Sequence, residues 1–173
     1  MHHPWIESLQ PDDRARVDQL IAVLRSLGCP DPEAWARREL RDNWPQLARY
    51  ALLHHLWSES INAWSDSLLW IDNLRDDPRD SPHSPAPEAA RALDHMLRAG
   101  VSRHDIARLA RFIAYETVFS VVHTLDEGFD PEREDRSPGW ALMELDPLGQ
   151  VTNRPLTHLH EDLPRLAARP PRS

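Results

Sequence analysis

The chain has 173 residues and a formal net charge of −8, and 40% of its residues are hydrophobic and 28% charged. This length accommodates one domain around a hydrophobic core, and the composition is that of a globular rather than a disordered protein. The excess of acids argues against a nucleic acid as partner, since nucleic-acid-binding modules usually carry an excess of basic residues.

Short features of the sequence argue against further classes. No apolar run approaches the ~20 residues that cross a bilayer, and the first five residues lack the basic start and apolar stretch of a secretory signal. Cys29 is the only cysteine, so neither an internal disulfide nor a multi-thiolate metal site is available. All twenty basic residues are arginine, which is typical of a GC-rich bacterial genome. We therefore expect a soluble protein of the bacterial cytoplasm, without a membrane partner.

The first helices are marked by their boundary residues. Pro11 and apolar side chains at helical spacing predict a helix over residues 11–27, which Gly28 ends as a C-terminal cap. The sequence Asp31-Pro32-Glu33 is a strong start signal for a shorter helix to about residue 42.

A third helix is predicted to start at Trp44-Pro45 and to continue to about residue 74. Apolar and aromatic side chains recur along it in steps of three and four, which makes a packing seam about seven turns long. We interpret it as the central helix of the fold. The seam consists of Leu47, Tyr50, His54, Trp57, Ile61, Trp64, Leu68 and Ile71.

The remaining elements follow a proline-rich loop at residues 76–87. A fourth helix is predicted over residues 88–99, and Ser102 with Asp105 begins a fifth in the manner of a capping box. The middle of this fifth helix, residues 112–125, is apolar nearly all round, so we expect it to be deeply packed. Residues 140–145 and 150–152 predict a β-hairpin, and residues 157–163 one further helical turn.

Together these elements predict a mainly α fold. We expect a bundle of about five helices around the long central helix, with a small C-terminal β-hairpin at about residues 140–152. Residues 1–168 should form a single helical domain, and residues 169–173 a frayed tail.

Two polar lines interrupt the two most apolar helices, each with the spacing four, three, four. A side chain recurs in one direction at this spacing, and helical bundles build metal and acid–base sites from inward-facing carboxylates and imidazoles. Two alternatives remain: a shared His/Glu site between the third and fifth helices, or solvated and structural pairs. The lines are His55, Glu59, Asn62, Asp66 and Glu116, Ser120, His123, Glu127.

Two further observations bear on that choice. Glu116 is surrounded by apolar residues, and a lone buried carboxylate is costly, so we expect it to have a partner. Near the C-terminus, His158, His160, Glu161 and Asp162 collect potential ligands, but we interpret them as ordinary surface. No known metal motif is matched, so we expect no metal site.

The negative charge is concentrated in two segments that follow the ends of the long helices and carry −6 of the net −8. A helix C-terminus disfavours anions by ~0.3–1 kcal/mol per charge. Both segments are placed against this preference, and such a placement can mark a functional surface. If the third, fourth and fifth helices run antiparallel to one another in turn, both segments meet as one acidic patch suited to a basic partner. Otherwise they are two solvated loops. The predicted binding residues are Asp72, Asp76, Asp77, Asp126, Glu127, Asp130, Glu132, Glu134 and Asp135.

The functional hypothesis is a non-enzymatic interaction module for a basic protein. A small acidic chain without a phosphate loop or nucleophile elbow fits the profile of an immunity protein that neutralises a bacterial toxin, and implies no cofactor and no catalytic residue. The alternative is a helical-bundle enzyme or metal-binding protein that uses His55, Glu59, Asp66, Glu116 and His123. A third hypothesis is self-association through Trp5 or Trp140; the sequence leaves the oligomeric state open.

Overall fold

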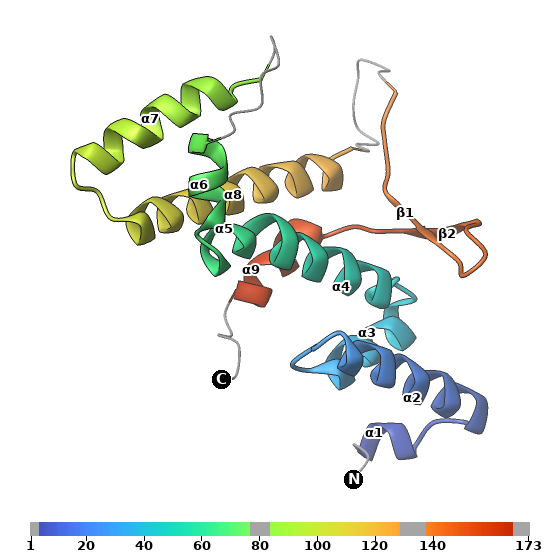
Figure 1. Cartoon of the computed structure of the whole chain (residues 1–173). Helices are drawn as coiled ribbons and strands as arrows, with labels where there is room; N and C mark the ends of the chain where they lie inside the picture. Colours follow the sequence, from blue (N-terminus) through green and yellow to red (C-terminus); the bar gives the residue numbers. More distant parts are fainter. Residues whose placement is uncertain (1–3, 77–83, 129–137, 168–173) are drawn as a thin grey trace. The chain divides into compact units, whose positions relative to one another are not determined.

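The computed structural model describes residues 4–76, 84–128 and 138–167. The predicted fold class is confirmed: these residues are mainly helical, with a two-stranded antiparallel hairpin near the C-terminus (Figure 1). The contacts within the chain divide it into two compact units, unit 1 (Met1–His55 with Ser120–Ser173) and unit 2 (Leu56–Phe119). The single domain over residues 1–168 stays a prediction, and the frayed tail lies outside the described residues. None of the helices in these ranges combines the length and apolarity that a membrane crossing needs.

Unit 1 begins with three helices, of which the second and third lie where the sequence predicts them, whereas the first was not predicted. Pro11 occupies the first turn of the second helix, and Gly28 follows that helix at φ 75°. The Asp31 side chain accepts a hydrogen bond of 3.2 Å from the Ala34 N–H and so caps the third. A buried cluster that includes Ile6 and Val17 joins the three. They are α1 (Pro4–Glu7), α2 (Pro11–Ser26) and α3 (Pro32–Asp42).

The rest of unit 1 comes from both sides of unit 2 in the sequence. It contains α4 (Gln46–His55), the last residues of α8 (Arg103–Asp126), β1 (Met143–Leu145), β2 (Val151–Pro155) and α9 (Leu159–Ala167). The strands pair antiparallel with Leu145 opposite Val151. In the turn between them the Asp146 carboxylate accepts from the backbone N–H groups of Leu148 and Gln150. The turn is where it was predicted, but β2 extends three residues further.

Arg154 joins this hairpin to α3 of unit 1 by an ion pair. Its guanidinium lies 2.8 Å from the carboxylate of Glu39 on α3 and 3.2 Å from that of Glu144 on β1. Glu39 also accepts a hydrogen bond from the Leu47 N–H at the start of α4. A two-stranded ribbon is marginal in water by itself, so these polar contacts contribute to its stability.

Unit 2 is built from the remaining helical segments. Its core is a cluster of Ile71, Leu93 and Ile106, each from a different helix, with Trp70 and Met96 packed against it. The segments are the π-helix η1 (Leu56–Asn62), α5 (Ala63–Asp66), α6 (Leu69–Asp76), α7 (Ala86–Arg98) and α8 up to Phe119.

The continuous central helix was predicted wrongly. The segment from residue 46 to 76 is divided into α4, η1, α5 and α6, and Ser67 between the last two is extended (φ −136°, ψ 137°). The cause is the polar run Ser65-Asp66-Ser67, whose short side chains compete for backbone hydrogen bonds. The Ser65 hydroxyl donates to the Asn62 carbonyl, and the Ser67 hydroxyl accepts from the Leu69 N–H at the start of α6.

The deep packing expected for the fifth helix was also wrong. This helix is α8, and the predicted capping box is present, because the Asp105 N–H donates to the Ser102 hydroxyl and that hydroxyl donates to the Asp105 carboxylate. However, Phe112, Ile113 and Val121 are 59%, 54% and 54% exposed. An all-round apolar sequence has no periodicity that tells which side of the helix is covered.

Candidate functional site

One side of α8 is anchored to the π-helix of unit 2. The rings of Trp57 and Tyr115 meet edge to face at 5.8 Å, and the Arg111 guanidinium lies over Trp57 at 5.5 Å. The Arg111 Nε–H also donates a hydrogen bond of 3.0 Å to the side-chain oxygen of Asn62. These contacts fix which side of α8 is turned toward η1.

The opposite side of α8 carries a row of exposed apolar side chains, here called the α8 stripe. It consists of Leu109, Phe112 and Ile113, which are 53%, 59% and 54% exposed. At about 100° per residue their directions fall within one sector, and the direction of Arg111 is opposite to it. A contiguous exposed apolar row at helical spacing is typical of a surface that binds another protein.

Glu116 lies in the middle of the same sector, one turn after the stripe. Its expected burial was wrong, because the side chain is exposed. Within the described ranges it forms no ion pair with another residue. The stripe therefore presents one carboxylate beside three apolar groups, an arrangement that complements a surface with both apolar and cationic side chains.

The residues of the predicted polar lines are divided between unit 1 and unit 2, so the shared site stays a prediction. Four of these residues are exposed: His55, Glu59, Asp66 and Glu116. The Asn62 side-chain oxygen accepts a hydrogen bond from Arg111. The π-helix between residues 56 and 62 has a wider turn than an α-helix, so side chains spaced four, three, four no longer share one direction. In the ranges that the structure describes, no three His, Cys, Asp or Glu side chains are grouped closely enough to hold a metal ion.

The other members of the second line lie in unit 1. His123 Nδ1 is 3.2 Å from the Glu127 carboxylate, and the ring of His123 is 4.8 Å from that of His160. His160 Nδ1 lies 2.6 Å from the Asp126 carboxylate, which also accepts a hydrogen bond from the His160 backbone N–H. The structure therefore brings together two imidazoles, each beside a carboxylate, of which only His123 belonged to the predicted site.

Among the predicted acidic residues, several are engaged inside the chain. The Asp126 side chain is only 5% exposed, and Glu127 contacts His123. Asp72 forms an ion pair with Arg103, and the hydrogen bond that Arg103 donates in this pair lowers the pKa of the Asp72 carboxyl group. Asp76 is exposed at the end of α6. Asp77, Asp130, Glu132, Glu134 and Asp135 lie outside the described residues, so the common acidic patch stays a prediction.

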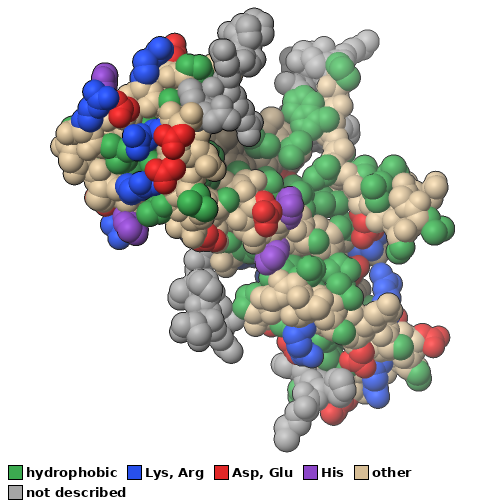
Figure 2. All heavy atoms as spheres, viewed as in Figure 1, with side chains coloured by type: hydrophobic (Ala, Val, Ile, Leu, Met, Phe, Trp, Pro, Cys, Tyr) green, Lys and Arg blue, Asp and Glu red, His purple; other side chains and the backbone are tan. Residues whose placement is uncertain are grey.

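The distribution of charge on unit 2 is mixed on the visible face. Figure 2 shows acidic and basic side chains interspersed over α6 and α7 rather than a surface of one sign. Arg98 on α7 pairs with Asp94 at 2.7 Å, and Arg108 on α8 pairs with Asp105 at 3.1 Å. Exposed pairs of this kind contribute little to stability, so they do not define a site by themselves.

The sequence did not reveal a buried ion pair in unit 1. The Arg49 guanidinium on α4 donates to the Asp162 carboxylate on α9 at 2.6 Å, and these side chains are 2% and 3% exposed. The Asp162 carboxylate also lies 2.7 Å from the Arg165 guanidinium and 3.7 Å from that of Arg38. The interpretation of residues 158–162 as ordinary surface was therefore wrong for Asp162. Asp162 lies three residues after the buried Leu159, and this helical spacing was the available signal.

Aromatic rings complete the surroundings of Arg49. The Arg49 guanidinium lies over Trp44 at 5.4 Å, and Trp44 stacks on His158 at 4.9 Å with an angle of 11° between the rings. The His158 carbonyl accepts a second hydrogen bond from Arg49. Burial lowers the pKa of Arg49, although the charge of Asp162 opposes that shift. The Arg49–Asp162 pair joins α4 to α9, while Trp44 beside it stays 39% exposed.

The tryptophans proposed for self-association also have internal contacts. Trp5 packs partly buried against the core of α1, α2 and α3, and the Trp140 ring N–H donates to the Thr124 carbonyl at 3.0 Å while 46% of the residue stays exposed. Self-association stays a prediction. Comparison of the chain with protein-family models, curated proteins and solved structures gave no match.

Proposed function

We propose that this protein is a non-enzymatic interaction module that binds a basic protein through the α8 stripe and Glu116. The observation that carries the proposal is the exposure of Leu109, Phe112 and Ile113 on one side of a helix whose other side is anchored by Arg111 and Tyr115. Large apolar side chains in such a row supply binding energy when a partner covers them, by about 25 cal/mol per Å² of buried apolar surface.

The proposed partner is basic because unit 2 exposes several carboxylates in addition to Glu116. Those on unit 2 that are exposed and form no ion pair with another described residue are Glu59, Asp66, Asp76, Glu88 and Glu116. Apolar contacts of the partner with the α8 stripe would position a cationic side chain of that partner next to the Glu116 carboxylate.

The acidic segments at residues 72–80 and 126–135 contribute in a second way. With the net charge of −8, they attract a cationic protein over about one Debye length, which needs no direct contact with each carboxylate. Small acidic proteins that neutralise a basic toxin have this profile, so an immunity role in the bacterial cytoplasm is the specific form of the proposal.

The test is affinity capture with the full-length chain from a lysate of the organism that encodes it. The variant Phe112→Ser removes the most exposed side chain of the stripe, and Leu148→Ser is the matched control because Leu148 is an apolar residue, 84% exposed, in the hairpin turn. We expect a protein of high isoelectric point to be retained by the wild type and the control, to be lost with Phe112→Ser, and to be retained less in 0.5 M salt. Retention of the same protein by Phe112→Ser, or capture of an acidic protein only, contradicts the proposal.

A second copy of the chain is the rival occupant of the stripe. Sedimentation velocity of the purified protein separates the two cases, because the proposal predicts a monomer. A dimer that Phe112→Ser dissociates and Leu148→Ser does not would show that the stripe serves self-association instead.

A further inference from the structure

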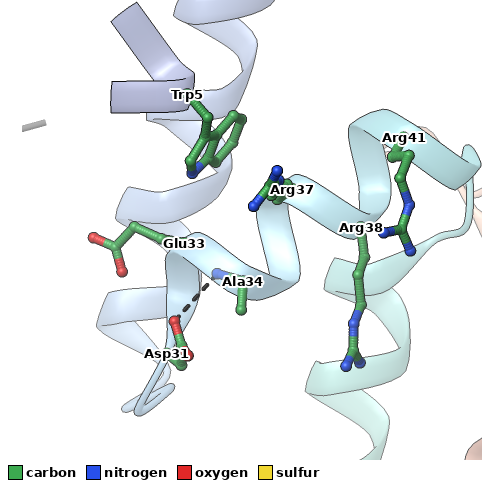
Figure 3. Close-up of a pocket in the computed structure, with 7 residues that line it drawn as sticks. All are labelled: Trp5, Asp31, Glu33, Ala34, Arg37, Arg38 and Arg41. Carbon is green, nitrogen blue, oxygen red and sulfur yellow. Dashed lines mark hydrogen bonds between the residues drawn. The ribbon is translucent and has the colours of Figure 1, made fainter. Parts of the chain in front are cut away.

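A pocket of about 380 Å³ lies in unit 1, on the surface of α3 beside α1. Figure 3 shows the guanidinium of Arg37 beside the Trp5 ring, with Arg38 and Arg41 further along the same helix. The Arg37 guanidinium is 5.9 Å from the centre of that ring. Trp5 packs against the buried cluster of α1, α2 and α3, so this wall of the pocket is held in place by the core.

Most charged groups that line the pocket have a partner in the chain. Arg38 lies 3.7 Å from Asp162, and Arg41 forms two hydrogen bonds with Asp42, at 2.6 and 2.7 Å. The two acids at the other end of the pocket are also engaged, since Asp31 caps α3 and Glu33 accepts a hydrogen bond of 2.6 Å from Arg25.

Arg37 differs from these groups. It is exposed, it stacks on Trp5, and it forms no ion pair with another residue in the described ranges. Its guanidinium therefore presents several N–H donors that can bind an oxyanion in the bidentate geometry typical of arginine. Arg38 and Arg41 already pair with carboxylates, so among the described residues that line the pocket Arg37 is the cation left to bind an anion.

We propose that this pocket binds a small organic phosphate monoester. A dianion is attracted more strongly than a monoanion to the Arg37 guanidinium, and a phosphate monoester carries close to two negative charges at pH 7 and offers oxygens for bidentate pairing. The Trp5 ring and the Ala34 methyl group supply apolar surface for the organic part of the ligand. The volume lies within the range of small-molecule pockets, and phosphate binding by Arg37 is separate from the proposed function of the α8 stripe, which belongs to unit 2.

The test is calorimetric titration of the full-length protein with phenyl phosphate at pH 7.5 and low salt. We expect one site, with affinity about tenfold lower in Arg37→Gln. It should be unchanged in Arg91→Gln, an exposed arginine on α7 and therefore a matched control. Arg37 is itself exposed, so its substitution should leave the fold intact, and far-ultraviolet circular dichroism checks this.

Two further ligands separate the parts of the proposal. Benzoate has the ring and a single negative charge, and it should bind at least about tenfold more weakly than phenyl phosphate. Inorganic phosphate lacks the ring and should also bind more weakly, with the same loss in Arg37→Gln.

Four results would overturn the proposal. Equal binding of phenyl phosphate by wild type and Arg37→Gln, or no binding up to 10 mM, would exclude the site. Benzoate binding as tightly as phenyl phosphate would exclude selection of a dianion. Inorganic phosphate binding as tightly would exclude the contribution of Trp5 and Ala34.

Discussion

Arg49 donates a hydrogen bond of 2.6 Å to Asp162 across 113 residues of sequence, and both side chains are almost completely buried. Removing two charges from water is costly, and their attraction offsets this cost only when the geometry is good and other hydrogen bonds are present. Here Arg49 also donates to Gln46 and to the His158 carbonyl. The pair therefore specifies how α9 is placed on α4.

Breaking this pair should destabilise the protein strongly. Asp162→Ala leaves the Arg49 charge buried without its carboxylate, and we expect a loss of about 3–5 kcal/mol in the free energy of unfolding. Urea denaturation followed by circular dichroism measures it. Asp42→Ala removes a partly exposed carboxylate, which pairs with the exposed Arg41, and it should change stability little. Equal effects of the two substitutions would show that burial of the first pair is not important.

The sequence predicted those parts of the fold that depend on local chemistry. Gly28, Asp31 and Ser102 mark helix ends, and Asp146 marks the hairpin turn, because each acts on backbone groups within a few residues. The break at Ser67 also had a local signal, the polar run of residues 65–67. We missed this signal because the apolar seam continues on both sides of the break.

Other features have no local signature. The partner of Arg49 lies on another helix far along the chain, and the exposure of Phe112 depends on which side of α8 its neighbours cover. The spacing that placed His55, Glu59 and Asp66 on one line assumed an α-helix, whereas η1 has the wider π turn. Of the surface formed by the α8 stripe and Glu116, only Glu116 was among the predicted candidate residues.

The alkaline titration of the protein should reveal the burial of Tyr50. Burial raises the pKa of Tyr50 to about 12, and the nearby Cys29 adds to the shift. The phenol has a pKa near 10 in the unfolded chain, so its contribution to stability is fully present below about pH 10 and is lost as the pH rises toward 12. Absorbance at 295 nm should show a late phase that Tyr50→Phe removes and Tyr115→Phe retains. A single early phase in the wild type would contradict this burial.

The thiol of Cys29 should react slowly in the native protein. It is 6% exposed, and burial raises its pKa, so the reactive thiolate is scarce at pH 8. We expect Ellman's reagent to modify it at least about a hundredfold more slowly in buffer than in 8 M urea. Comparable rates in the two solutions would mean that the turn after α2 opens readily.

Gly128 should not tolerate a side chain. A Cβ atom there would lie 2.1 Å from the Trp140 ring and 2.5 Å from the Trp140 carbonyl oxygen, and the backbone oxygen cannot move aside by a rotamer change. We expect Gly128→Ala to cost about 1–3 kcal/mol in thermal or urea unfolding. The control Gly149→Asn places a side chain in open space at a positive φ that asparagine accepts, and it should change little. An equally stable Gly128→Ala protein would contradict the packing of Trp140 on this glycine.

The most direct measurement for the proposed function is the Kd of the captured basic protein for wild type and Glu116→Gln at two salt concentrations. At 50 mM salt we expect Glu116→Gln to bind about five- to tenfold more weakly, because a cation on the partner loses its carboxylate. At 500 mM salt the two Kd values should converge while Phe112→Ser stays weak, since apolar contacts are not screened. A Kd that is the same for Glu116→Gln and wild type at low salt, or that does not depend on salt at all, would contradict recognition of a basic partner by this face of α8.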